Sequence, residues 1–268
     1  MKKTVFITGT SSGFGREIAK HLHEKGHVVI GTSRNPKANN DTTETLQLDV
    51  NDMNSINVAM NYLAKKYPKI DVLINNAGFG IAGAVELTSI EEAKGQIETN
   101  FFGVVRMIQA FIPYFRKRDK GLIINVSSIG GLVGLPFQAF YSASKFALEG
   151  FTQGLRSELR PFNIQVTHIN PGDFATDFGQ NRQFIKNTAN ELYEPTFSAV
   201  LKIYKEDEIK GANPQEVAFL VEKLIHKKGK LKIHYLIGPK LQVFGVFVKR
   251  MIGATNFEYM MRMIYKIK

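Results

Sequence analysis

The feature that most constrains the fold is a glycine-rich turn between a short apolar run and a helical pattern near the N-terminus. Thr4–Thr8 reads TVFIT and is bounded by glycine, which is typical of a buried parallel strand. A helical pattern over Arg16–Lys25 stops at Gly26, and a second strand is predicted over His27–Ser33. The turn contains three glycines: Gly9, Gly13 and Gly15. Such a strand–turn–helix–strand unit places a helix N-terminus where it can hold a phosphate group, although glycines at this looser spacing also occur in ordinary turns.

The same alternation continues along the chain. Further strands are predicted at Glu44–Val50, Asp71–Asn75, Leu122–Ser127, Ile164–Ile169 and His234–Ile237. Helices are predicted at Asp52–Tyr67, capped by Asp52 or Asn51, and at Ser89–Arg118 and Phe140–Arg160. The pattern indicates an α/β fold, a doubly wound parallel sheet of about seven strands with helices on both faces. In such sheets ligands bind beyond the carboxyl ends of the strands.

Three polar residues in the second half of this pattern have a regular spacing. Tyr141 lies thirteen residues after Ser128, and Lys145 lies four residues after Tyr141, so a helix would present Tyr141 and Lys145 on one face. A fixed ammonium favours a neighbouring phenolate, so we expect Lys145 to lower the pKa of Tyr141 and to suit it to general acid–base chemistry. Ser128 would hold a substrate oxygen nearby. A Tyr and a Lys one turn apart also occur by chance on many helices, so the pair alone does not establish a catalytic site.

Length and composition fit one domain. The chain has 268 residues and 44% hydrophobic residues, enough for a substantial core. It contains no cysteine, which excludes disulfides and thiolate metal sites, and no His, Asp and Glu residues have metal-ligand spacing. We therefore expect no bound metal. No apolar run reaches the length of roughly 18 residues that predicts a transmembrane helix.

Four motifs occur together in one order, and the combination is specific. They are the Gly9–Gly15 turn, the Asn75–Gly78 sequence NNAG, the Ser128/Tyr141/Lys145 set and Pro171-Gly172-x3-Thr176. On these motifs the chain resembles the short-chain dehydrogenase/reductase family from about residue 3 to residue 178. Ser128–Gly150, with its GLPF and YSASKFALEG sequences, is similar to hydroxysteroid and retinol dehydrogenases in particular. The resemblance implies a single Rossmann-type domain and hydride transfer between a nicotinamide and a carbonyl carbon.

The resemblance also implies a role for each catalytic residue. Tyr141 would be the acid–base group, and Lys145 would lower its pKa and bind the nicotinamide ribose. Ser128, rather than the adjacent Ser127, has the spacing that the family requires for orienting the substrate oxygen. Asn100 would hold a water in a proton relay behind Lys145.

The cofactor contacts that the resemblance implies lie on several loops. The glycine turn would approach the pyrophosphate, Asp49 and Val50 would lie along the adenine, Asn76 on the adenosine side, and Thr176 at the carboxamide. The full set is Gly9, Ser11, Ser12, Gly13, Phe14, Gly15, Asp49, Val50, Asn76, Tyr141, Lys145 and Thr176.

The end of the second strand favours NADP(H) over NAD. An acid at this position binds the 2′-hydroxyl of NAD and repels a 2′-phosphate. Here the first acid is Asp41, whereas Arg34 offers a guanidinium fork and Ser33 a hydroxyl suited to a phosphate. The alternative is that Arg34 is a surface residue or stacks on the adenine of NAD.

Aromatic residues gather where the substrate should bind. They are Phe79, Phe137, Phe140, Phe174, Phe178 and Phe184, and we expect about half of them to line an apolar cleft. The predicted reaction is therefore NADP(H)-dependent interconversion of a carbonyl and an alcohol on a small hydrophobic molecule such as a steroid, a retinoid or a lipid-like ketone. We expect the long insertion Asp173–Ala212 to close over this cleft as a lid. The alternative is a cofactor-binding regulatory or scaffold protein that has lost catalysis.

The positive charge of the chain is concentrated at its end. Residues 227–268 contain ten Lys or Arg against the single Glu258, a net +9 of the chain's +11, so the nearly neutral body predicts no nucleic-acid binding. Within residues 240–268, apolar residues alternate with cations in LQVFGVFVKRMIGA and FEYMMRMIYKI. This segment either packs on the domain or on a second subunit, or it is a surface helix in peripheral contact with an anionic membrane. The resemblance further implies a homodimer or homotetramer, and we expect a cytoplasmic protein with or without membrane association.

Overall fold

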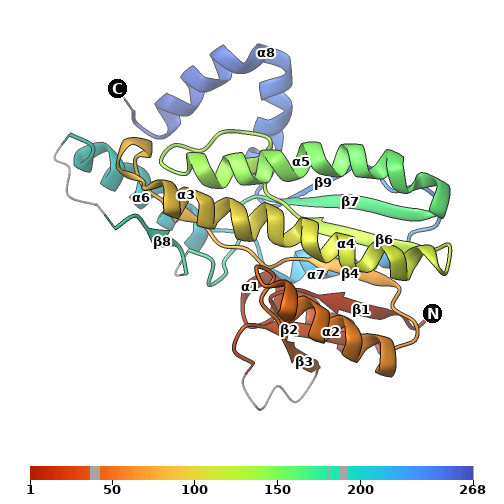
Figure 1. Ribbon diagram of the computed structural model, residues 1–268. Coiled ribbons are helices and arrows are strands. Elements are labelled where there is room, and N and C mark those ends of the chain that lie inside the picture. The colour runs from red at the N-terminus through yellow and green to blue at the C-terminus, as the bar shows by residue number, and fades with distance from the viewer. Residues whose placement is uncertain (37–42, 180, 187–191, 268) are drawn as a thin grey trace.

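A parallel seven-stranded sheet forms the centre of the computed structural model, which describes residues 1–36, 43–179, 181–186 and 192–267. The strand order is β3-β2-β1-β4-β6-β7-β9 (Figure 1). The strands are β1 (Thr4–Ile7), β2 (Val28–Ser33), β3 (Glu44–Gln47), β4 (Val72–Asn75), β6 (Gly121–Val126), β7 (Ile164–Pro171) and β9 (His234–Ile237). The predicted doubly wound α/β fold is confirmed.

Helices cover both faces of this sheet (Figure 1). One face carries α2 (Met53–Lys66), α4 (Gly103–Arg116) and α5 (Ala139–Leu159), and the other carries α1 (Gly13–Glu24) and α7 (Gln215–His226). Because successive side chains of a strand point to opposite faces, Phe6 enters the first core while Val5 and Ile7 enter the second. Strands buried on both faces explain the continuous apolar runs in the sequence.

The topology places the predicted site residues at one edge of the sheet. The chain order reverses between β1 and β4, which pair in parallel, and the turns after these two strands begin at Thr8 and Asn76. Ser127 and Ser128 come directly after β6 at the same edge, and β7 ends there at Pro171. This reversal opens a crevice at the carboxyl ends of the strands, the usual ligand position in an open α/β sheet.

The predicted helical region over Ser89–Arg118 is confirmed, but it is not one uniform α-helix. It is α3 (Ile90–Ile97), a π-helical segment (Glu98–Phe102) and α4 in succession. A π-helical turn inserts one residue and rotates the rest of the helix, which turns Asn100 toward α5, where it hydrogen-bonds Ser144. Apolar periodicity alone does not reveal such an insertion.

Other helix and strand boundaries differ from the predicted ones by a few residues. The first helix begins at Gly13 rather than Arg16, so the last two glycines of the turn belong to its first turn. The third strand ends at Gln47, earlier than predicted. Asp52 caps α2 by accepting a hydrogen bond from the Asn54 N–H, so the choice between Asp52 and Asn51 falls on Asp52.

The insertion after β7 has structure of its own. Its β8 (Gln183–Phe184) pairs in parallel with β5 (Ile81–Ala82), and α6 (Glu194–Ile209) comes next. Gln180 and residues 187–191 of the insertion lie outside the described residues, as does Asp41 near the cofactor-selective strand end.

The chain finishes in α8 (Lys240–Ile264), which rises beside α5 and turns back toward α6 (Figure 1). Gly253 adopts φ 78° and ψ 167°, which breaks the helix into two arms. Tyr265, just beyond the second arm, packs on Tyr204 of α6 with ring centroids 5.1 Å apart. No helix among the described residues combines the length and apolar character needed to cross a membrane.

Candidate active site

The turn after β1 favours glycine at three positions. Gly9 and Gly13 have positive φ values of 72° and 54°. At Gly15, a Cβ atom would lie 2.1 Å from the Gly9 carbonyl oxygen and 2.5 Å from Nδ2 of Asn76. The backbone of the turn is therefore bare at the N-terminus of α1, which is the arrangement that a pyrophosphate requires. Ser11, Ser12 and Phe14 lie on the same turn.

Asn76 shapes this turn from the neighbouring strand. Its side-chain amide donates to the carbonyl oxygens of Thr8 and Gly9 at 3.0 and 2.8 Å. The Thr8 hydroxyl accepts from the backbone N–H groups of Asn76 and Ala77, each at 3.0 Å. The amide group of Asn76 is thus committed to the turn, and any contact with adenosine would come from the rest of the residue.

The residues predicted to select the cofactor lie beyond the ends of β2 and β3. Ser33 ends β2 half-buried, and the exposed Arg34 comes next. Gln47 Nε2 donates to the Arg34 carbonyl at 3.2 Å, and no described residue forms an ion pair with the Arg34 guanidinium. Asp49 is half-buried and accepts from the Asn51 N–H at 2.9 Å. Val50 is buried against α4, where a Cβ at Gly103 would lie 2.7 Å from its Cγ2.

Tyr141 and Lys145 lie one turn apart on α5 and are both buried, with exposed fractions of 7% and 6%. The Lys145 Nζ atom is 5.8 Å from the centroid of the Tyr141 ring. Nζ also donates to the Val126 carbonyl at the end of β6, at 2.9 Å. The sheet edge therefore anchors the ammonium beside the phenol.

The expected lowering of the Tyr141 pKa is not what the structure gives. Burial raises the pKa of Tyr141 to about 12, and the nearby Ser128 hydroxyl lowers it only in part. Burial also lowers the pKa of Lys145 to about 8, partly offset by Glu149. Desolvation disfavours both charged forms, and it is the largest cause of both shifts. At neutral pH the phenol is protonated, the form that donates a proton to a carbonyl oxygen.

Ser128, not Ser127, faces the phenol. Its hydroxyl accepts from the Gly130 N–H at 2.9 Å at the start of a short 3₁₀ turn, and it lies close enough to Tyr141 to affect the pKa of the phenol. Ser127 is buried on the other side, beside Glu149. The alternating direction of side chains along extended backbone accounts for this division.

Asn100 is fully buried behind Lys145. Its Nδ2 donates to the Phe79 carbonyl at 2.9 Å and to the Ser144 hydroxyl at 3.1 Å, and its Oδ1 accepts from the Phe79 N–H at 3.1 Å. Through these hydrogen bonds the Asn100 side chain ties the chain just after the NNAG turn to α5. Gly78 of that turn also lies close to both Asn100 and Lys145. The predicted water relay stays a prediction.

The loop after β7 lies over the phenol. Thr176, predicted to reach the carboxamide, is half-buried, and its hydroxyl accepts from the Phe178 N–H at 3.3 Å. Phe178 packs on Tyr141 with ring centroids 5.9 Å apart. Asp177 pairs with Arg16 of α1 at 3.3 Å, a link across the mouth of the glycine turn.

The predicted aromatic residues divide between core and cleft. Phe174 is buried against Phe14, with ring centroids 5.1 Å apart, and belongs to the core. Phe137 packs on Phe197 of α6 at 5.2 Å, and Phe184 is 45% exposed on β8. Among these four residues, Phe178 is the one whose ring packs on Tyr141.

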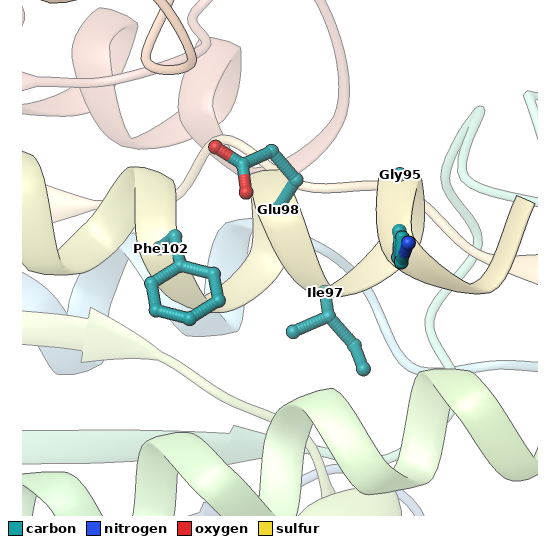
Figure 2. A pocket seen from close by; sticks show the side chains of 5 residues that line it. Gly95, Ile97, Glu98 and Phe102 are labelled. Carbon is teal, nitrogen blue, oxygen red and sulfur yellow. The ribbon is translucent and has the colours of Figure 1, made fainter. Parts of the chain in front are cut away.

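A separate apolar hollow lies on the outside of the π-helical segment, away from the phenol. It has a volume of about 420 Å³ and is lined by Lys94, Gly95, Ile97, Glu98 and Phe102. In Figure 2, Ile97 and Phe102 extend from one side of the helix while Glu98 points the other way. It contains none of the predicted catalytic residues.

Comparison with known proteins decides the family. The model for short chain dehydrogenases matches residues 3–185. The chain belongs to the short-chain dehydrogenase family. A 3-ketodihydrosphingosine reductase from Bacteroides thetaiotaomicron is 43% identical over 265 residues, covering 98% of each chain. Retinol dehydrogenase 8 from Bos taurus is 32% identical, over 83% of this chain and 78% of that protein, in agreement with the predicted likeness to retinol dehydrogenases.

A solved structure agrees with the predicted fold and cofactor. The structure of ElxO with NADP bound superposes with a TM-score of 0.72 at 27% identity, over 88% of this chain and 96% of ElxO. The chain is thus an oxidoreductase of the short-chain type. Its own residues fit a dinucleotide, because the turn at Gly9 and Gly15 leaves a cradle that side chains would fill.

Proposed function

We propose that the protein is an NADP(H)-dependent reductase of a hydrophobic ketone with a long lipid-like chain. The observation that carries the proposal is the buried, protonated Tyr141 with Ser128 and Lys145 around it. The 43% identity to a 3-ketodihydrosphingosine reductase over the whole chain supports a lipid ketone ahead of a steroid or a retinoid. NADPH supplies the hydride when bound.

The side chains divide the remaining work. Ser128 holds the carbonyl oxygen beside the phenol, and Tyr141 donates its proton to that oxygen as the alcohol forms. Lys145 stabilises the resulting phenolate through its charge and carries the nicotinamide ribose. Asn100 supports this arrangement by fixing the Phe79 turn and Ser144 of α5.

The cofactor preference rests on Arg34 and Ser33. A guanidinium that forms no ion pair with a described residue at the end of β2 matches a doubly charged 2′-phosphate. ElxO, solved with NADP bound, supports the same choice.

We infer where the hydrocarbon tail of the substrate binds from an apolar cluster next to the loop that precedes α5. Leu135 and Phe137, which precede α5, pack with Tyr204 of α6 and with Tyr265 and Ile267 after α8. We infer that this cluster and Phe178 receive the hydrocarbon chain, and that Asp173–Ala212 closes over it as a lid.

The test is NADPH oxidation by the purified protein, followed at the nicotinamide absorbance. We expect turnover with 3-ketodihydrosphingosine to exceed turnover with steroid ketones and retinal, and Tyr141→Phe to lose at least about 100-fold of it. Turnover of steroid ketones alone would overturn the lipid assignment. Absence of turnover with every ketone, together with tight NADPH binding, would favour the non-catalytic scaffold.

We further propose that the first arm of α8 contacts an anionic membrane. Leu241, Phe244, Phe247 and Met251 are 81%, 58%, 48% and 82% exposed, and they share one side of the helix. The opposite side, with Val246, packs on the domain. One side of this arm therefore packs on the domain and the other is exposed. The exposed side is apolar, so we expect it to bind a partner.

The cations are less concentrated around this arm than the sequence suggests. Residues 227–232 precede β9 and lie at the amino edge of the sheet, opposite α8. Lys249 turns inward, donating to the Leu132 carbonyl at 2.5 Å. Lys240 and Arg250 stay exposed beside the apolar side, each contributing on the order of 1 kcal/mol near an anionic surface.

Co-sedimentation with anionic vesicles tests this contact. Binding at low salt is expected, with weakening as salt rises, because screening shortens the reach of the charges. The double variant Leu241→Ser, Met251→Ser should lose binding, whereas Val58→Ser on α2, also an exposed apolar residue, should retain it. If the protein stays in the supernatant at low salt, the proposed membrane contact is wrong. The expected cytoplasmic location would not be affected by that result.

We also propose that the protein binds further copies of itself. Phe102 beside α4 and Phe146 on α5 are 46% and 42% exposed, and the hollow of Figure 2 lies beside Phe102. A homodimer or homotetramer would cover them. Light scattering on the purified protein measures its oligomeric state, and a monomer at micromolar concentration would contradict the proposed self-association.

A further inference from the structure

The face of α5 that carries Tyr141 and Lys145 continues to a third buried polar residue. Glu149 lies four residues beyond Lys145 and is 4% exposed. Its Oε1 accepts from Asn170 Nδ2 at 2.6 Å. Its Oε2 lies 3.0 Å from His234 Nδ1 and 3.5 Å from His168 Nε2.

We define this cluster as Ser127, Glu149, His168, Asn170 and His234. It joins α5, β7, β9 and the residue that follows β6. The two imidazoles stack in parallel, with ring centroids 5.6 Å apart and planes 11° apart. Their approaches to Glu149 do not meet hydrogen-bond geometry. As a result, the cluster holds six of the nine buried side-chain polar atoms that lack a hydrogen-bond partner within the described residues.

Unpaired polar atoms at this density need an explanation, because buried polar groups are normally satisfied by protein or by ordered water. Their number and proximity suit a short chain of water molecules between Lys145 and His234. His234 is the outer end, with 16% of its side chain exposed, whereas His168 is completely buried. The cluster thus runs from the catalytic lysine toward solvent.

Ketone reduction creates the demand that such a route would meet. Each turnover moves one proton from Tyr141 to the new alcohol oxygen, and the phenolate must regain one from solvent. Both Tyr141 and Lys145 are buried. Asn100 is fully buried and uses its side-chain groups to hold Phe79 and Ser144, so a relay past it would need a water held by other groups.

We propose that Glu149 and His234 form a proton-supply route to Lys145, with Glu149 as a positioning residue that acts through the lysine. The proton enters at His234, passes by Glu149 and cluster water to Lys145, and then replaces the proton that Tyr141 has given up. In the oxidation direction the same groups release it. The inference rests on the proposed ketone reduction.

The charges around the route come from every element packed against it. Lys145 and Arg156 belong to α5, His168 to β7 and Arg250 to α8, and both arginines lower the pKa of His234. Burial raises the pKa of Glu149, against the opposing effects of Ser127, Asn170 and Lys145. Burial is also the largest cause that lowers the pKa of His234. The two shifts bring a carboxyl group and an imidazole closer together in proton affinity, as proton exchange between them requires.

The test compares Glu149→Gln with Glu158→Gln, an exposed residue on the same helix. In Glu149→Gln we expect kcat for reduction to fall by at least about tenfold, less than for loss of the acid itself, with NADPH affinity unchanged. The solvent deuterium isotope effect on kcat should rise, and the fall in kcat should deepen as pH increases. Glu158→Gln should match the unmodified protein. A lower kcat with an unaltered pH profile and isotope effect would mean a structural role and overturn the proposal.

His234→Gln provides a second variant at the outer, partly exposed end. It should slow reduction in the same way, and added imidazole should restore kcat. An unchanged kcat and isotope effect in this variant would overturn the proposal even if Glu149→Gln did not fold. Histidine NMR of the protein without substrate is independent of turnover: Glu149→Gln should move the titration midpoint of His234, and an unmoved midpoint would contradict the route whether or not a ketone is reduced.

Discussion

The ring of Phe178 lies 5.9 Å from the ring of Tyr141, centroid to centroid, with 55° between their planes. Phe178 belongs to the insertion and Tyr141 to α5, so this contact joins the insertion to the proposed acid–base residue. We expect Phe178→Ala to raise the KM for the lipid ketone by about 3- to 10-fold, the scale of one aromatic contact. Phe184→Ala, on exposed β8, is the matched control, and steady-state kinetics would measure both. An equal effect in the two variants would contradict the contact's role.

Tyr141→Phe removes only the phenolic hydroxyl. Turnover should fall by at least about 100-fold, the scale of a general acid, because the phenyl ring has no proton to donate. NADPH binding, followed by fluorescence titration, should remain, since the glycine turn and Lys145 are intact. Near-normal turnover would remove Tyr141 from its assigned role.

Arg34→Ala tests the cofactor choice. The unmodified protein should bind NADPH more tightly than NADH, and the variant should narrow this gap by roughly 1–3 kcal/mol, the scale of a hydrogen bond to a charged group. Calorimetric titration with both cofactors measures it. Arg160→Ala, exposed after α5, should leave the gap unchanged. Equal affinities in the unmodified protein would refute the preference for NADP(H).

Burial of Lys145 has a cost that depends on pH. Its pKa is about 8 in the folded protein and near 10.5 when unfolded, so between these values the unfolded chain binds more protons. The free energy of unfolding should therefore rise with pH from about 8 to 10.5 through this group. Lys145→Met should lack this rise, whereas Lys94→Met, exposed on α3, should keep it. Denaturant unfolding across that pH range measures the difference, and parallel curves for Lys145→Met and the unmodified protein would contradict the assignment.

The ion pair between Arg16 and Asp177 joins α1 to the loop after β7 at 3.3 Å. Because the pair spans the mouth of the glycine turn, we expect hydrogen exchange in residues 173–179 to slow when NADPH and ketone bind together. Asp177→Asn should reduce this protection. Equal exchange with and without both ligands would count against the lid.

The sequence was sufficient for the sheet because buried parallel strands are continuous apolar runs, and β1, β4 and β6 each read that way. It was also sufficient to bring Ser128, Tyr141 and Lys145 together, since the four-residue spacing on a helix is rigid. The π-helical insertion around Asn100 was not predictable, because one extra residue leaves the apolar pattern nearly unchanged.

Burial was the main quantity that the sequence left unknown. The direction of the Tyr141 pKa was wrong because the sequence shows a neighbouring charge but not the loss of solvent around it. Glu149 was missed for the same reason, although its four-residue step from Lys145 was visible. The inward turn of Lys249 likewise depends on where α8 packs against Leu132.

The position of β9 at the outer edge of the sheet has a consequence for synthesis on the ribosome. The family model matches residues 3–185, yet His234 lies well beyond that match, on the strand that pairs with the edge of β7. A nascent chain that contains Tyr141 but not yet β9 would leave β7 as an open strand edge, which is prone to association. We therefore expect the site around Tyr141 and Glu149 to be completed only after β9 has paired with β7.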